Sequence, residues 1–205
     1  MKTIDHKALA VFWMAQMNEI LPRRYQQAFI YGNFEPDINL LTHLHGFSKQ
    51  EKPHGHRSGT IFPILIRMLR RDSGKPLSWG RCYRLGKCFH YAADSFTFPH
   101  NREFAGNLKA HNQYEAALHR CWRVILPQYH PHLCGTYRNV SDAQLRRRIL
   151  ALHQEYRSTP HHSCEQDCRY ILIVTKLLLE TYMIPAGTEL YSGKVTKIRP
   201  ISSSI

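Results

Sequence analysis

Apolar residues recur at spacings of three and four along most of the chain, whereas strictly alternating apolar and polar positions are scarce. The first spacing puts apolar side chains on one face of a helix, and alternation is typical of a strand. Together with capping and breaking residues, the periodicity predicts helices over residues 5–21, 23–31, 58–71, 79–96, 102–125, 141–152 and 163–183. The pattern therefore predicts an all-α protein built as a bundle of several helices.

Proline and glycine predict where helices end. Pro22 follows the first helix, and Gly32 offers a left-handed cap to the second. Pro36 favours an extended neighbour, so we expect an ordered loop over residues 32–41. A chain of 205 residues suits one domain. We place this domain at residues 1–186 and expect a C-terminal extension with weak, β-like structure at residues 187–205.

Charge is the first unusual feature of the composition. The chain has 28 Lys and Arg against 15 Asp and Glu, a formal net charge of +13 with histidine neutral. Such a balance favours anionic partners, including phosphate groups, nucleic acid and acidic membrane. A basic surface that only keeps the protein in solution fits the charge equally well.

Targeting signals and cysteines indicate the compartment. The apolar run at residues 8–15 lacks a small-residue cleavage site and continues as a helical pattern. No segment is apolar for long enough to span a bilayer. The six cysteines form no paired C-x-x-C knuckles, so we expect free thiols rather than a zinc ribbon. These features favour a cytoplasmic protein without stable membrane insertion.

Candidate chemistry is concentrated in the segments FHYAADSFTFPHN and HNQYE. His90 and Asp94 are four residues apart, so both side chains lie on one face of a helix. His100 follows beyond Pro99, on a loop that can return over that face. A second pair, His111 and Glu115, repeats the four-residue spacing on the next helix. Imidazole and carboxylate ligands are typical of open, catalytic zinc sites.

A single His-x-x-x-acid pair is most often an ordinary helix-surface contact. The metal pocket is therefore predicted from the two pairs and His100 together, not from either pair alone. His119, four residues after Glu115, extends the same spacing, but a structural role is the commoner one for such a residue. The 14 histidines of the chain are otherwise spread over loops and helices.

At these residues the sequence resembles the zinc-dependent phospholipase C family, whose all-helical fold is shared with single-strand-specific zinc nucleases. The family pattern is an upstream Asp and His, then H-x-x-x-D, a His six residues later, and H-x-x-x-E. Asp37 in FEPDIN matches the upstream Asp. His56 in PHGHRSG matches the upstream His, and His54 is an alternative. The motif match covers roughly residues 30–120.

The resemblance implies two zinc ions held by separate ligand sets. The first set is Asp37, His56, His90 and Asp94, and the second set is His100, His111 and Glu115. Secreted family members hold a third zinc through an amino-terminal Trp, a nearby His and a bridging Asp. His6 and Asp94 match the latter two, but Met1 stands in place of Trp, which leaves the third zinc open.

The resemblance further implies hydrolysis of a phosphodiester by a metal-bound hydroxide, with phospholipid as one substrate. Asp37 would be the catalytic carboxylate that orients or deprotonates the attacking water. Two alternatives stay open. One is a nuclease on the same scaffold, which needs aromatic platforms for bases beside the metals. The other is a helical zinc-binding module without catalysis. The oligomeric state and the substrate head group are open at this stage.

Overall fold

The computed structural model describes residues 1–38, 58–72, 76–135, 137, 140–160, 162–184, 188–191 and 194–197. Within these residues the chain forms seven α-helices, one short 3-10 helix and three short strands. The α-helices are α1 (Thr3–Gln16), α2 (Arg23–Ile38), α4 (Ser58–Asp72), α5 (Trp79–Ser95), α6 (Leu108–Gln128), α7 (Asp142–Arg157) and α8 (Cys164–Tyr182). The 3-10 helix η1 (Phe98–His100) lies between α5 and α6. The predicted all-α fold is confirmed.

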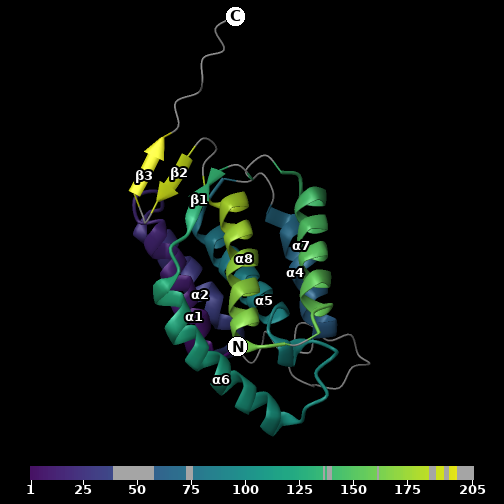
Figure 1. Cartoon of the computed structure of the whole chain (residues 1–205). Coiled ribbons are helices and arrows are strands. Elements are labelled where there is room, and N and C mark those ends of the chain that lie inside the picture. The colour runs from purple at the N-terminus through teal and green to yellow at the C-terminus, as the bar shows by residue number, and fades with distance from the viewer. Residues whose placement is uncertain are drawn as a thin grey trace, which may run out of the picture.

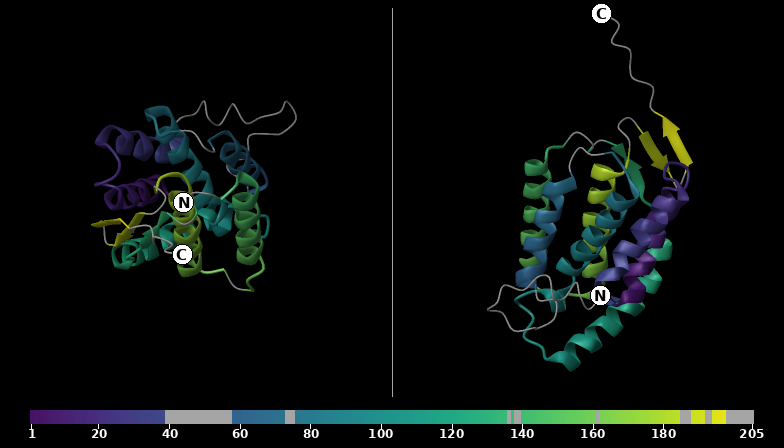
Figure 2. Two further views of the ribbon diagram at one scale, coloured as in Figure 1. Left: turned by 90° about the horizontal axis from the view of Figure 1, so that it is seen from above. Right: turned by 180° about the vertical axis from the view of Figure 1, so that it is seen from behind.

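Helix α8 lies between α6 and α7, with α5 behind it in the view of Figure 1, and the view from above in Figure 2 shows the same arrangement. Its apolar side chains recur at helical spacing, and Ile171, Val174 and Leu178 are fully buried. Helices α5 and α6 both pack against it. The large aromatic side chains Trp13 and Trp122 fill the core on the side of α1 and α6. Burial of these surfaces is the main driving force for assembling the bundle.

Two glycines allow α2 and α5 to pack unusually closely. A Cβ atom at Gly32 would lie 2.0 Å from the carbonyl oxygen of Tyr83, and one at Gly86 would lie 2.1 Å from that of Phe29. Any side chain at either position would therefore collide with the backbone of the other helix. This close approach brings the C-terminal half of α2 beside the middle of α5.

The path of α2 corrects the sequence prediction. The helix does not end at Gly32 but continues to Ile38, so the expected loop over residues 32–41 is wrong for residues 32–38. The remainder of that segment lies outside the described residues. Gly32 is a helix-packing contact rather than a cap. Pro36 lies in the last turn, where its missing N–H deprives only Gly32 of a helical hydrogen-bond donor. Asp37 consequently projects from a helix.

Helix α6 also begins later than predicted. Its N-cap is Asn107, whose side chain accepts a hydrogen bond from the backbone N–H of Ala110 at 3.0 Å. Residues 102–107, predicted to be helical, form turns and extended backbone instead. The later start places His111 in the first turns of α6, at the end of the bundle that also holds the N-terminus (Figure 1).

The three strands form a small antiparallel sheet of order β1-β2-β3. They are β1 (His132–Cys134), β2 (Thr188–Tyr191) and β3 (Lys194–Lys197), and Leu133 pairs with Leu190. The sheet lies at the opposite end of the bundle from the N-terminus (Figure 1). The β-like C-terminal segment is thus paired with a strand that follows α6. The division into a domain and an extension stays a prediction.

Candidate metal centre

Two groups of metal-ligating side chains meet at one end of the bundle. The first group is His6, His90 and Asp94, and the second is His100, His111 and Glu115. Within each group the ligand atoms lie within 4.8 Å of one another. Helices α1 and α5 supply the first group, whereas η1 and α6 supply the second. The side chains predicted from the two four-residue spacings therefore do converge.

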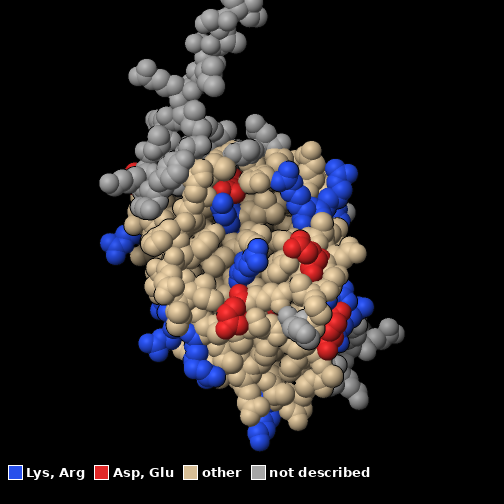
Figure 3. Space-filling view, viewed as in Figure 1, with Lys and Arg blue, Asp and Glu red and all other residues tan. Residues whose placement is uncertain are grey.

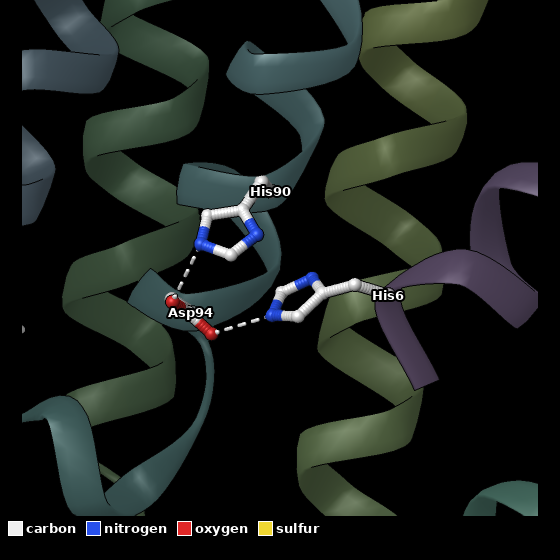
Figure 4. Close-up of side chains that lie close together, drawn as sticks. All are labelled: His6, His90 and Asp94. Carbon is white, nitrogen blue, oxygen red and sulfur yellow. Dashed lines mark hydrogen bonds and ion pairs between the residues drawn. The ribbon is translucent and has the colours of Figure 1, made fainter. Parts of the chain in front are cut away.

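In the first group, Asp94 lies between two imidazoles (Figure 4). Its Oδ2 is 3.3 Å from Nε2 of His90, and its Oδ1 is 3.1 Å from Nε2 of His6. Nδ1 of His90 donates a hydrogen bond to the carbonyl oxygen of Asn33 at 2.9 Å. This bond fixes the tautomer in which Nε2 of His90 carries the lone pair that a metal requires.

Asp37 belongs to the edge of this first group. Its Oδ1 lies 3.6 Å from Nε2 of His90, and its side chain is 16% exposed. Among the described residues, its Oδ2 is buried without a hydrogen-bond partner. The close packing of α2 on α5 is what brings Asp37 to His90. The predicted ligand His56 and its alternative His54 lie outside the described residues.

The second group is more accessible to solvent. Nε2 of His111 lies 3.3 Å from Oε1 of Glu115, and Nε2 of His100 lies 3.8 Å from the same oxygen. His111 is 26% and Glu115 17% exposed, whereas Asp94 is only 2% exposed. A substrate or water molecule approaching the centre would therefore meet the second group first.

The α-ammonium group of Met1 lies between the two groups. It is 3.1 Å from Oδ1 of Asp94, 2.9 Å from Oε1 of Glu115 and 3.1 Å from Nε2 of His100. Burial lowers its pKa, but the two carboxylates outweigh this effect and raise the pKa to about 10. Burial opposes ionisation of Asp94, yet the ammonium and the neighbouring imidazoles hold its pKa well below the usual range. The carboxylates thus already bind one positive charge.

The residues present fit zinc. The donor set combines carboxylates with imidazoles, as open zinc sites do. Burial and the nearby His90 lower the pKa of His6 to about 4, and burial together with His100 lowers that of His111. Both imidazoles are therefore neutral at physiological pH, the form that binds a metal. Nδ1 of His6 is buried and, like Asp37 Oδ2, has no hydrogen-bond partner among the described residues.

Several neighbours of the ligands have structural contacts instead. Nδ1 of His119 lies 2.6 Å from Oδ1 of Asp5, which joins α6 to α1 and supports the structural role for His119. The side-chain amide of Asn101 donates to the carbonyl oxygen of Thr97 at 3.0 Å, so Asn101 stabilises the turn around η1. His153 of α7 contacts the same Asn101 side chain at 3.2 Å. No local pattern predicts this contact, because the two residues are far apart in the chain.

One comparison with known proteins identifies the family. The family model described as zinc dependent phospholipase C matches residues 5–163. No curated protein and no solved structure matches the chain. Of the helices that the structure describes, none has the length and apolar character needed to cross a membrane.

Proposed function

Because this chain belongs to the zinc-dependent phospholipase C family, we propose that it is a zinc-dependent hydrolase that cleaves a phosphodiester, with phospholipid as its first candidate substrate. The observation that supports this proposal most is the convergence of two imidazole–carboxylate groups on Asp94. We further propose two zinc ions, one for each group. A third ion involving His6 is not needed, since His6 already lies in the first group.

The proposed reaction adds water across a P–O bond. The water oxygen bonds to phosphorus, the bond from phosphorus to the alcohol oxygen breaks, and the alcohol leaves with a proton. Bound zinc would supply positive charge for the phosphate oxygens and lower the pKa of the attacking water. The products are a phosphomonoester and an alcohol, which for a phospholipid is the diacylated glycerol.

Asp37 is the residue of this chain best suited to accept the proton of the water. It lies at the edge of the first group, 3.6 Å from His90, and is partly exposed, so water can reach it. A carboxylate in this position can hold the water in line with phosphorus and take up its proton.

A nuclease is the second candidate, and one surface feature favours it. The rings of Trp79 and Tyr83 stack with centroids 5.7 Å apart, and Tyr31 stacks on Tyr83 at 5.8 Å. Phe34 contacts Tyr31 and lies one helical turn before Asp37. Trp79 is 53% and Tyr31 45% exposed. This aromatic strip, formed by these four residues, offers ring faces on which unpaired bases can stack.

The charges beside the strip itself rank it below the phospholipid proposal. Figure 3 shows the face of α6, α7 and α8, on which basic side chains are scattered among acidic ones, whereas the strip lies on α2 and α5. Proteins that hold single-stranded nucleic acid combine stacking rings with a basic groove along the backbone. The ammonium of Lys87 already binds the Glu35 carboxylate at 2.8 Å and lies over the Tyr83 ring. This lysine is therefore partly neutralised.

The decisive experiment is zinc analysis of the purified protein together with a screen of phosphodiesters. The screen should contain choline- and glycerol-linked phospholipids, a soluble nitrophenyl diester and single-stranded DNA and RNA. We expect about two zinc ions per chain and turnover of at least one diester. Zinc without turnover of any of these would instead favour the non-catalytic module.

Two variants connect the activity to the site. His111→Ala should lose one zinc and at least about a hundredfold in kcat/KM, because a ligand of an open site is removed. His130→Ala, at an exposed position after α6, is the matched control and should behave like the wild type. For the nuclease candidate, Trp79→Ala should weaken cleavage of nucleic acid selectively and leave the nitrophenyl diester unaffected.

A further inference from the structure

Asp167 forms a hydrogen-bonded junction outside the two ligand groups. It lies in the first turns of α8, and its side chain is fully buried. Oδ2 accepts hydrogen bonds from the backbone N–H of Phe98 and from the hydroxyl of Tyr114, both at 2.9 Å. Oδ1 accepts one from the hydroxyl of Tyr156 at 2.7 Å. One carboxylate thus joins α8, η1, α6 and α7.

The two oxygens of Asp167 serve different parts of the molecule. Phe98 begins the three-residue η1 that ends at His100. Tyr114 directly precedes Glu115 and follows His111 by three residues on α6. Oδ2 therefore binds both segments that supply the second ligand group. Oδ1 binds Tyr156 of α7, and α7 supplies no residue to either group.

From this division we propose that Asp167 is a positioning residue for the second metal site: by tying η1 to α6 through Oδ2, it sets the separation of His100 from His111 and Glu115. This inference rests on the proposed function only in taking that group to bind zinc. Nε2 of His100 lies 3.8 Å from Oε1 of Glu115, a contact between two separate elements that no helical spacing fixes. Asp167 lies beyond the segment matched by the family model, which ends at residue 163.

A buried carboxylate that only stabilised the core would respond differently when its hydrogen-bond donors are removed. Burying such a group is costly, and removing one hydrogen bond to it costs stability wherever the donor comes from. In that case the loss of either tyrosine hydroxyl would affect zinc binding equally. A positioning role instead predicts that only the hydroxyl on the side of α6 matters for zinc.

The test compares Tyr114→Phe with Tyr156→Phe in the full chain. Each variant removes one hydroxyl donor to Asp167 and keeps the aromatic ring. Zinc affinity is measured by competition with a chromophoric chelator, and unfolding by urea is followed on the chelator-treated protein. We expect comparable losses of stability in the two variants. Tyr114→Phe should weaken the binding of one of the two zinc ions by about tenfold, as is typical when a supporting contact is lost. Tyr156→Phe should leave both zinc affinities within about twofold of wild type.

Asp167→Asn adds a second measurement. The amide retains one acceptor oxygen but cannot serve all three donors, so we expect one zinc ion to be lost while the other is retained. Cobalt substitution reports on the same site, because a displaced ligand changes the visible absorption spectrum. If Asp167→Asn does not fold, the two tyrosine variants still decide the question.

Three outcomes overturn the inference. These are equal effects of the two tyrosine variants on zinc affinity, no effect of Tyr114→Phe, and a wild-type protein that binds no second zinc. Failure of the proposed function is distinguishable from these. A wild type that binds two zinc ions but hydrolyses no diester refutes the hydrolase, while the zinc affinities of the variants still test Asp167.

Discussion

Oδ1 of Asp94 lies 3.7 Å from Nε2 of His100. The last turn of α5 therefore contacts η1, the next helix in the chain, at the centre of the site. The other oxygen of the same carboxylate faces His90 at 3.3 Å. Among the described residues, Asp94 is therefore the one side chain that contacts an imidazole from each ligand group. The two candidate metal sites share it, and they should respond together when it is changed.

Asp94→Asn is expected to remove both zinc ions, because the amide lacks the charge and one of the two acceptor oxygens. Zinc content measured by mass spectrometry should fall from about two to near zero. The value of kcat/KM on the best diester should fall by about a thousandfold or more. Asp142→Asn, at the start of α7 and away from both groups, is the control. Retention of one zinc in Asp94→Asn would show that only the first site depends on this carboxylate.

Gly86→Ala should destabilise the protein and weaken its first metal site. The new methyl group would lie 2.1 Å from the carbonyl oxygen of Phe29, so α2 must move away from α5. We expect the free energy of unfolding to fall by about 3 kcal/mol, as for other overpacked contacts. Asp37 moves with α2, so zinc affinity should fall too.

Gly80→Ala is the matched control for that change. Among the described residues, a methyl group there meets only the end of the Arg84 side chain at 3.6 Å, an ordinary contact. Because alanine is the better helix former, stability should rise slightly or stay unchanged. A Gly86→Ala variant as stable as Gly80→Ala would contradict the close packing of α2 on α5. Urea unfolding of both chelator-treated variants gives the comparison.

Local spacing made part of this site predictable. His90 with Asp94 and His111 with Glu115 are four residues apart, so the helix itself orients each pair, and the structure keeps both. The helical periodicity likewise predicted the fold class. The wrong helix end predicted at Gly32 also came from local reasoning, because a glycine that is followed a few residues later by a proline ordinarily ends a helix. Only the neighbouring α5 backbone shows why glycine is required there.

Contacts between distant segments were beyond such reasoning. The ammonium group of Met1 contacts Asp94 and Glu115, and only the family resemblance, not the residue type or its spacing, indicates the amino terminus as a ligand-like position. Asp167 reaches Phe98 and Tyr114 across the bundle. These contacts depend on how whole helices pack, and a single sequence carries no local signal for them.

Removal of zinc should lower thermal stability. Without metal, the Met1 ammonium and the imidazoles are the positive partners that the described residues offer to the carboxylates of the centre. Free zinc at about a hundred times the dissociation constant contributes roughly 2.7 kcal/mol to stability. For a chain of this size, that corresponds to a fall in Tm of about 5–10 °C after treatment with chelator.

Calorimetry with and without chelator measures this shift. Adding back zinc should restore Tm, whereas magnesium should not, because magnesium prefers oxygen ligands over imidazole. His130→Ala should shift like the wild type. A Tm that does not change on zinc removal would argue that neither ligand group binds the metal tightly.

His153 should make the stability of the metal-free protein depend on pH. Its ring stacks on Phe62 at 4.4 Å, and Nε2 lies 3.1 Å from the carbonyl oxygen of Ser95 and 3.2 Å from Oδ1 of Asn101. Burial is the main reason that its pKa is lowered from 6.5 to about 4. Below pH 6.5 the unfolded chain therefore takes up a proton that the folded protein does not.

The sign of the effect follows from this difference in proton uptake. The contribution of neutral His153 to the free energy of unfolding is complete above pH 6.5 and is lost as the pH falls towards 4. Between pH 7 and pH 4.5, wild type should lose about 2 kcal/mol more than His153→Gln, whose amide can donate to the same acceptors without titrating. Urea unfolding in the presence of chelator excludes zinc release as the cause. His130→Gln should keep the wild-type dependence, and parallel curves for wild type and His153→Gln would assign the acid sensitivity to other groups.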